Sequence, residues 1–321
     1  MLLLTESLDP WHNLALEELL FDVHDGGVLL FLWQNQNTVV IGRNQNAWKE
    51  CRSGLLEDEG GKLARRTSGG GAVFHDLGNL NFSFITDKKS YDQTRQLQLI
   101  IDAAASLGIP AAFTGRNDIV CGEGAKFSGN AFRHSQKSDL HHGTLLVDVD
   151  MDKLSRYLAP SKEKLRSKGV DSVRSRVCNL REFRPTLDIP TLRDALIQAF
   201  AKRYGSYRTL REDSLDARAL NALSEKHASW AWRFGASPRF DVAFSRRFSW
   251  GEIEFRFQLK NGKIESAEVF SDAMDEAFVR ALAPALEGAL YTAPAVRAAL
   301  TALGGDTAQE LSLWLSQCID A

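Results

Sequence analysis

The sequence is poor in the residues that support disulfide-rich or metal-bound folds. Its 321 residues include four cysteines, at positions 51, 121, 178 and 318, and no two of them form a C-x-x-C pair. Neither a disulfide framework nor a cysteine-based zinc site is expected, since both need paired or closely spaced thiols. We expect reduced thiols that are mostly buried.

A strong charge of either sign is also missing. The 39 lysines and arginines against 41 aspartates and glutamates give a net charge of −2, and the isoelectric point is about 6.4. This balance leaves no overall excess of positive charge that would favour binding to nucleic acid or to a membrane surface. Partners must therefore be recognised by local features.

Long apolar runs are absent as well. No run approaches the roughly 20 residues that a membrane helix needs, and the first residues, MLLLTE, lack the basic start of a signal peptide. We expect a cytoplasmic protein. A chain of this length is sufficient for two domains with separate cores.

The stretch that stands out is residues 65–84, RRTSGGGAVFHDLGNLNFSF. Three successive glycines allow the main chain to approach a ligand with its N–H groups exposed, and Arg65 and Arg66 add forked, permanently charged donors. Apolar and polar residues then alternate through Leu80, Phe82 and Phe84, which indicates a strand behind the loop. The pattern predicts an anion-binding loop for a phosphorylated or carboxylated small molecule. A flexible hairpin loop with solvated arginines is the alternative, and a Walker loop is excluded because no Gly-Lys-Ser/Thr follows.

A second polar group follows at residues 126–133, KFSGNAFR, and 141–146, HHGTLL. In a regular strand Lys126, Ser128 and Asn130 share one face, and Gly129 suggests close approach of another group. His141 and His142 are neighbours, so they point to opposite faces and cannot both bind one metal ion. We expect one histidine to be structural and the other to line the site.

Helix and strand signals alternate along the rest of the chain. Asp9-Pro10 predicts the start of an amphipathic helix to about residue 23, and Asn261-Gly262 predicts a tight hairpin turn. The other expected elements are a hairpin of strands 28–33 and 38–41, helix 91–107, strands 111–114, 118–120, 126–133 and 143–149, helix 192–204 capped by Thr191, strands 253–259 and 264–270, and helices 275–286, 294–303 and 307–319. The pattern breaks around residues 230–238, where we place a domain boundary.

Taken in order, RRTSGGGAVFHDLGN, GRNDIV, KFSGNAFR and HHGTLL resemble the motif series of the lipoate–protein ligase A family. The resemblance extends from Asp9-Pro10-Trp11 through residues 172–176 to the region 230–272. It implies an α+β fold: a large mixed-sheet catalytic domain of the biotin/lipoate ligase type at 1–236 and a small α+β accessory domain at 237–321. A biotin ligase is a weaker alternative, since its usual glycine-arginine repeat differs from RRTSGGGAVF.

The resemblance also implies roles for individual residues. Lys126 is expected to be catalytic, between an acyl carboxylate and the α-phosphate of ATP, and Asp118 is expected to hold Mg²⁺. A loop at 169–179 with Arg174 and Arg176 could close over the nucleotide, and Arg43 is a site residue of second rank. The other expected contacts to nucleotide or acyl group are Arg66, Ser68, Gly71, Ala72, Val73, Phe74, Arg133 and His142.

The activity implied by the resemblance is attachment of lipoate, by way of lipoyl-AMP, to a lysine of a carrier protein. The carriers would be lipoyl domains of 2-oxoacid dehydrogenases and the glycine-cleavage H protein, and the enzyme is expected to be a monomer. An ATP-independent octanoyl or lipoyl transferase is the alternative; it needs a nucleophilic cysteine, for which Cys121 and Cys178 are the candidates.

Overall fold

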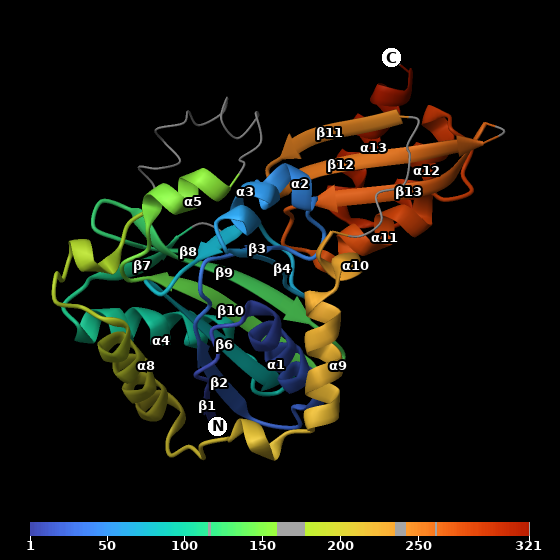
Figure 1. Cartoon of the computed structure of the whole chain (residues 1–321). Coiled ribbons are helices and arrows are strands. Elements are labelled where there is room, and N and C mark those ends of the chain that lie inside the picture. Colours follow the sequence, from blue (N-terminus) through green and yellow to red (C-terminus); the bar gives the residue numbers. More distant parts are fainter. Residues whose placement is uncertain (115–116, 159–176, 235–241, 261, 321) are drawn as a thin grey trace. The chain divides into compact units, whose positions relative to one another are not determined.

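The structure, a computed structural model, describes residues 1–114, 117–158, 177–234, 242–260 and 262–320, with only the main chain of residues 48, 49 and 320. The chain forms two compact units (Figure 1). The first contains Met1–Ile41, Ala47–Thr67 and Ala72–Arg233, and the second contains Gly42–Asn46, Ser68–Gly71 and Phe234–Ala321. The predicted boundary after residue 236 falls within 235–241, outside the described residues.

A seven-stranded mixed sheet forms the centre of the first unit. Its strand order is β1-β2-β6-β10-β9-β8-β7, in which β1 and β2 are parallel and the other neighbours are antiparallel. The strands are β1 (Leu2–Leu4), β2 (Val28–Trp33), β6 (Asn79–Asp87), β7 (Ala111–Thr114), β8 (Asp118–Cys121), β9 (Ala125–His134) and β10 (Ser138–Leu146).

Two helices, α4 (Gln93–Ser106) and α8 (Ile189–Tyr204), cover one face of this sheet, side by side in Figure 1. Phe82, Phe84 and Phe127 are buried beneath them. The cap of α8 is Asp188, whose side chain accepts a hydrogen bond from Thr191, so the predicted cap at Thr191 is wrong. The helix starts earlier because Pro190 fits its first turn, where no N–H donor is needed.

On the opposite face lie α1 (Pro10–Val23) and α9 (Ala217–Ala228). The start of α1 is as predicted: the Asp9 side chain accepts a hydrogen bond from the Trp11 amide. The helix is not amphipathic, however, because α9 covers its outer side as the sheet covers its inner side. As a result Glu17 and Glu18 are buried.

A small sheet of order β4-β3-β5 accompanies α1; its strands are β3 (Thr38–Ile41), β4 (Lys62–Arg65) and β5 (Val73–His75). The predicted hairpin of β2 and β3 is therefore wrong, since the two strands belong to different sheets. Asn13 binds the segment between them, donating to the Gln34 carbonyl and to Asn35 Oδ1, and Asn37 has φ 42°. The chain thus leaves the large sheet instead of folding back along it.

Shorter elements connect these layers in the first unit: α2 (Ala47–Glu50), α3 (Ser53–Asp58), α5 (Met151–Tyr157), α10 (Trp230–Arg233) and the 3₁₀ turns η1 (Leu180–Glu182) and η2 (Glu212–Ser214). None of the helices in the described ranges is both long and apolar enough to cross a membrane.

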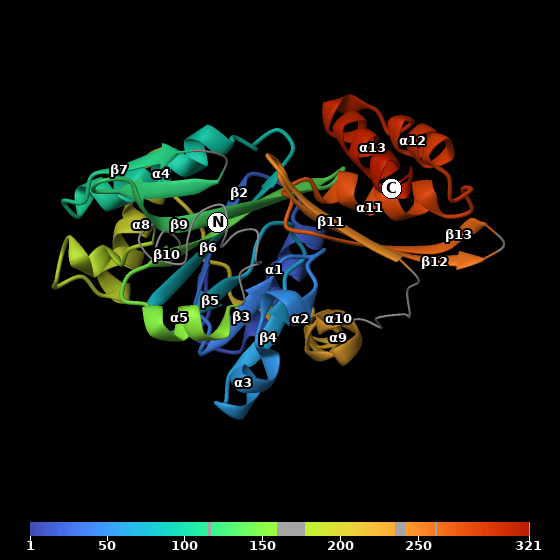
Figure 2. The same cartoon turned by 90° about the horizontal axis from the view of Figure 1, so that it is seen from above.

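The second unit contains a three-stranded antiparallel sheet covered on one face by three helices (Figure 2). The strands are β11 (Val242–Phe248), β12 (Gly251–Lys260) and β13 (Lys263–Ser271), and the helices are α11 (Glu276–Leu286), α12 (Ala293–Thr301) and α13 (Gly305–Asp320). Lys260 pairs with Lys263, which confirms the predicted hairpin, although residue 261 lies outside the described residues. The α+β class and its smaller C-terminal part are confirmed.

Candidate active site

A β-bulge determines the direction of the Lys126 side chain. Lys126 and Phe127 of β9 stand where β8 provides only Val120, so the regular alternation is interrupted. Lys126 therefore does not share a face with Ser128 and Asn130, and that prediction is wrong. Phe127 instead enters the apolar layer under α4 and α8.

The amine of Lys126 forms an ion pair with Asp118 at the start of β8. Nζ lies 2.7 Å from Oδ1, and the two side chains are 32% and 23% exposed. Oδ1 receives no well-directed hydrogen bond, although the pair is close. We interpret this as a partly solvated charge pair that an incoming anion can rearrange, not as a structural bridge.

The absence of a side chain at Gly129 determines where the Lys126 side chain can lie. A Cβ built on Gly129 would lie 2.9 Å from Lys126 Nζ and 3.0 Å from its Cε, so the side chain occupies the space that the glycine leaves. The Gly129 amide also donates to Thr144 Oγ1 of β10 at 3.3 Å. This close approach was expected from the sequence, and the group that approaches is the lysine itself.

A buried polar cluster lies between α1 and the large sheet. Ser83 of β6 and His142 of β10 stand opposite each other, and both contact Glu17 Oε1 of α1, at 2.5 and 2.8 Å. Burial raises the pKa of the Glu17 carboxyl, but the charge and hydrogen bond of His142 and the hydrogen bond of Ser83 together hold it below its ordinary value. Glu17 was missed in the sequence, where nothing distinguishes it from Glu18 and Asp22 of the same helix.

The neighbouring histidines separate as expected. His141 lies in the layer under α4, where its ring nitrogens contact Gln96 Oε1 and Asn130 Oδ1, both at 2.9 Å. Burial, with a smaller effect of His142, lowers its pKa to about 3. His141 is therefore structural and neutral, and His142 is the histidine of the polar cluster.

The two arginines before the glycines have different surroundings. Arg65 donates to the carbonyls of Trp232 and Arg233, at 2.9 and 2.7 Å, and so joins β4 to α10. Arg66 is buried and donates to the Val40 carbonyl at 3.3 Å. Burial lowers the Arg66 pKa to about 10, against the opposing charge of Glu17. Only Arg66 adjoins the polar cluster.

The three glycines have three different environments. A Cβ on Gly69 would lie 2.6 Å from the Ala273 carbonyl, and Gly70 has φ 91°. Gly71 has neither constraint, since a Cβ there would meet nothing within 4 Å. Ser68 is fully buried, and its carbonyl accepts a hydrogen bond from the Arg43 amide at 2.8 Å.

The residues after the glycines form an edge strand. Val73 and Phe74 pair with β3 on one side only, so alternate N–H groups of β5 point away from that sheet. The Phe74 ring packs on Tyr157, with 5.5 Å between the centroids, while Ala72 and Val73 are partly exposed. This edge can supply main-chain donors to a ligand.

Arg133 is not brought next to Lys126. The two lie at opposite ends of β9, roughly 20 Å apart along a strand of this length. The Arg133 guanidinium stacks on Phe21 of α1, 4.2 Å from the ring centroid, and its Nη1 is buried without a hydrogen-bond partner among the described residues. Its contact with a substrate stays a prediction.

Asp118 is the carboxylate that was expected to bind Mg²⁺. Among the described residues no three histidine, cysteine or acidic side chains are grouped closely enough to enclose a metal ion. Mg²⁺ commonly takes only one or two carboxylates and completes its shell with water and phosphate oxygens. The Asp118 carboxylate, with one oxygen against Lys126, fits a cation of that kind held mainly by a nucleotide.

The four cysteines are free thiols in the structure, and the prediction that most of them are buried is confirmed for Cys51, Cys121 and Cys178. Cys121 and Cys178 have their sulfur atoms 3.4 Å apart, and both can donate to the Ala125 carbonyl. The Cys178 hydrogen bond lowers the pKa of Cys121, whereas the same contact and burial raise that of Cys178. Both side chains lie in the apolar layer under α4 and α8, on the face opposite Lys126. Their role in covalent catalysis is not favoured.

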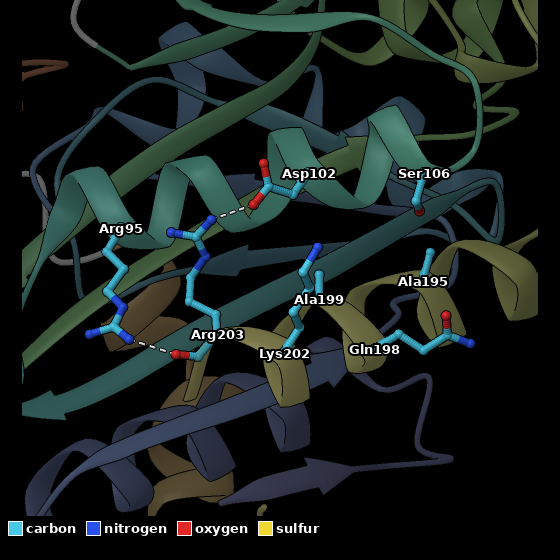
Figure 3. A pocket seen from close by; sticks show the side chains of 8 residues that line it. All are labelled: Arg95, Asp102, Ser106, Ala195, Gln198, Ala199, Lys202 and Arg203. Carbon is cyan, nitrogen blue, oxygen red and sulfur yellow. Dashed lines mark hydrogen bonds and ion pairs between the residues drawn. The ribbon is translucent and has the colours of Figure 1, made fainter. Parts of the chain in front are cut away.

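A surface depression between α4 and α8 lies on the face of the sheet opposite Lys126 (Figure 3). Two of its charged side chains, Arg203 and Asp102, pair with each other, and Arg95 donates to the Arg203 carbonyl at 2.6 Å. This depression is not part of the candidate site. The loop at 169–179 with Arg174 and Arg176 cannot be placed, since residues 159–176 lie outside the described residues.

The first unit thus has an α+β fold in which a partly exposed lysine of β9 and a buried polar cluster of α1, β6 and β10 lie on the same sheet. The model of the lipoyl protein ligase A/B catalytic domain family matches residues 9–201, and that of the bacterial lipoate protein ligase C-terminus matches residues 237–315. The chain belongs to the lipoyl protein ligase A/B family, and it is a ligase or transferase for lipoate attachment.

Solved structures agree with this assignment. P. falciparum LipL1 in complex with lipoate is 27% identical, with a TM-score of 0.88 over 99% of each chain. The bi-partite lipoate protein ligase of Thermoplasma acidophilum is 31% identical (TM-score 0.66; 75% of this chain and 98% of that chain). A lipoate-protein ligase A bound with ATP is 28% identical (TM-score 0.63; 73% and 98%).

Proposed function

We propose that the protein is an ATP-dependent lipoate–protein ligase. It activates free lipoate to lipoyl-AMP and then transfers the lipoyl group to a lysine of a carrier protein. The observation that carries this proposal is the partly exposed amine of Lys126, held above Gly129 and 2.7 Å from Asp118. The ATP bound to a related lipoate-protein ligase A supports the choice of nucleotide.

Activation is needed because a carboxylate is a poor electrophile and its oxygen is a poor leaving group. In the first step a carboxylate oxygen of lipoate forms a bond to the α-phosphorus of ATP, and the bond to the β-phosphate oxygen breaks. Pyrophosphate leaves with that electron pair. Lys126 lies between the two anions and stabilises the negative charge that develops on the α-phosphate.

In the second step the amine of the carrier lysine attacks the acyl carbon, and AMP leaves as the amide forms. The attacking nitrogen loses one proton to solvent or to the phosphate. The charge on the departing phosphate is again close to Lys126, so one fixed cation serves both half-reactions.

Main-chain donors from Gly71 to Phe74 and the guanidinium of Arg66 would hold the nucleotide. Asp118 would hold Mg²⁺, which supplies positive charge to the phosphates when it is bound. Ser68 would contact the carboxyl end of the acyl substrate or the nucleotide. Arg133 lies roughly 20 Å from Lys126 along β9, so it would contact only a part of a substrate far from the reacting carboxylate. The acyl tail would extend towards the polar cluster of Glu17, Ser83 and His142.

We further propose that the enzyme acts as a cytoplasmic monomer. Its carriers would be the lipoyl domains of 2-oxoacid dehydrogenase acyltransferase subunits and the glycine-cleavage H protein. The structure of the archaeal ligase described with its E2 lipoyl domain supports a carrier of this kind.

The test is exchange of labelled pyrophosphate into ATP by the purified protein with Mg²⁺, with and without lipoate. Lipoate-dependent exchange is the expected result, because adenylation is reversible. No exchange by a protein that still moves octanoyl groups between carriers would instead establish the transferase.

Gly71→Ala tests whether the loop touches the nucleotide. A methyl group at this position meets no protein atom within 4 Å, and the backbone does not need a positive φ. The melting temperature should stay the same while the KM for ATP rises about tenfold or more, since the methyl group would occupy the space of the ligand. Gly54→Ala, which is equally unhindered, is the matched control and should behave as wild type. An unchanged KM would remove the loop from the nucleotide site.

Cys121→Ala with Cys178→Ala tests the transferase alternative. The double variant should keep lipoate-dependent pyrophosphate exchange and carrier lipoylation within a few-fold of wild type, with a melting temperature lower by a few degrees for the lost packing. Complete loss of lipoyl transfer by a folded variant would favour the thiol mechanism.

A further inference from the structure

His75 at the end of β5 is a buried histidine whose hydrogen bonds are only partly satisfied. It is 3% exposed, and its Nδ1 lies 3.1 Å from Asn35 Nδ2 and 3.5 Å from Asn81 Nδ2. Its other ring nitrogen, Nε2, is buried and has no hydrogen-bond partner among the described residues. A buried donor left unsatisfied is costly and needs an explanation.

A chain of buried amides fixes which nitrogen of His75 carries the proton. Asn13 Nδ2 lies 2.8 Å from the carbonyls of Ser7 and Gln34, and a carbonyl can only accept, so this atom is the amide nitrogen. The nearest atom of Asn35 lies 3.0 Å away, and because an amide nitrogen cannot accept a hydrogen bond, that atom must be the oxygen, which shares one of the two N–H groups. The other atom of the Asn35 amide is then the nitrogen, which donates to Nδ1 of His75. The ring proton therefore resides on Nε2.

The ring is also uncharged. Burial, followed by the nearby charges of Arg66 and His142, lowers the His75 pKa to about 3. Around neutral pH the unsatisfied group is thus a neutral N–H donor, on a ring that is close to Arg66 and to His142 of the polar cluster. Asn13 and Asn35 are completely buried themselves, so the tautomer is set by the protein and not by solvent.

Cross-strand pairing places His75 at a defined distance from Lys126. His75 approaches Asn81 of β6, Asn81 is opposite Thr144 of β10, and Thr144 accepts a hydrogen bond from Gly129 of β9, over which Lys126 lies. The strands β6 and β9, beside which the two side chains lie, are two strand spacings apart, roughly 10 Å. The carbon chain that joins the carboxylate of lipoate to its dithiolane ring is shorter than this, and a hydrogen bond at each end gives it a comparable reach.

We infer that the Nε2–H of His75 donates a hydrogen bond to a dithiolane sulfur of lipoate and so favours lipoate over octanoate, with Asn35 and Asn13 as positioning residues. This inference rests on the proposed function. A saturated alkyl tail offers no acceptor, so it leaves the donor unsatisfied. Discrimination against an analogue that lacks a hydrogen-bonding group is the typical result of such a buried donor. Because sulfur is a weak acceptor, we expect a factor of about ten.

The test compares lipoate with octanoate as substrates for pyrophosphate exchange. In His75→Phe, kcat/KM for lipoate divided by kcat/KM for octanoate should be about tenfold lower than in the wild type. His75→Gln keeps an N–H donor near the position of Nε2, so its ratio should be close to that of the wild type. An unchanged ratio in His75→Phe would overturn the inference. So would an equal loss for both acids, which indicates a structural role or a contact with the carboxylate.

Asn35→Asp tests the positioning without changing the shape of the side chain. A carboxylate at this position accepts from Nδ1 and raises the His75 pKa, against the opposing charges of Arg66 and His142. Above the raised pKa the proton moves to Nδ1, so the preference for lipoate should be lost; below it both nitrogens carry protons and the preference should return. The wild-type ratio should be constant over the same range. If the lipoate-to-octanoate ratio of kcat/KM in Asn35→Asp equals that of the wild type at every pH, the assigned tautomer is contradicted.

A binding measurement separates this inference from the proposed function. In ¹⁵N-histidine-labelled protein, the His75 ring should show a protonated Nε2 without any ligand. Lipoate should shift the Nε2 resonance, and octanoate should leave it in place. If lipoate shifts no resonance and supports no exchange, the proposed function fails; if it supports exchange but does not shift Nε2, only the present inference fails.

Discussion

Lys126→Gln should reduce lipoate-dependent pyrophosphate exchange by a factor of hundreds. Glutamine is similar in length but carries no charge, so the variant loses the cation that neutralises the developing negative charge. Loss of one preorganised contact of this kind typically costs about 3–4 kcal/mol in the transition state. The fold should be unaffected, because the ion pair with Asp118 is partly solvated and pairs of this kind contribute little to stability.

The control for this variant is Lys137→Gln, which removes an exposed lysine from the turn between β9 and β10. It should exchange pyrophosphate like the wild type. Supplying synthetic lipoyl-AMP to Lys126→Gln separates the half-reactions, and we expect transfer to the carrier to be slow as well. Near-normal turnover of the variant would remove Lys126 from the mechanism.

Gly129→Ala should have the second largest effect, although it changes no charge. The new methyl carbon would lie 2.9 Å from Lys126 Nζ and 3.0 Å from Cε, whereas Thr144 Oγ1, the next atom, is 3.9 Å away. The flexible end of the lysine can move aside, so the backbone keeps its place and the amine is displaced. A shift of about 1 Å in a catalytic group can cost roughly a hundredfold in rate.

The measurement is kcat for exchange, together with a thermal melt to show that the variant is folded. Gly54→Ala serves again as the control, since it adds a methyl group in open space. A folded Gly129→Ala enzyme with wild-type kcat would mean that the lysine position seen here does not matter for catalysis.

Features governed by local chemistry could be predicted from the sequence. The start of α1 follows from Asp9 and Pro10, and the β12–β13 hairpin follows from Asn261-Gly262 between alternating residues. The strand that carries Lys126 was also predicted, because its pattern is set by neighbours along the chain. The next strand was expected at 143–149, whereas β10 starts at Ser138 and so includes His142. The separation of His141 from His142 follows from the same alternation.

Features governed by distant partners could not be predicted. The hairpin of β2 and β3 failed because Asn13, from another element, binds the segment between them. Arg65 looked like an anion ligand until the carbonyls of α10 were seen to accept its donors. Glu17 could be recognised as a site residue only when Ser83 and His142 were brought to it by the fold.

The bulge at Phe127 also has a consequence for the tolerance of the chain to changes in length. Deleting one residue from the β8–β9 turn, at 122–124, could be absorbed by a tighter turn. Deleting Phe127 would remove the bulge and leave Lys126 opposite Val120, on its present face, but it would also take a fully buried ring out of the apolar layer beneath α4 and α8. Within this hairpin, a deletion scan should therefore separate tolerated losses in the turn from a large loss of stability at a single phenylalanine, which lies on the face opposite Lys126.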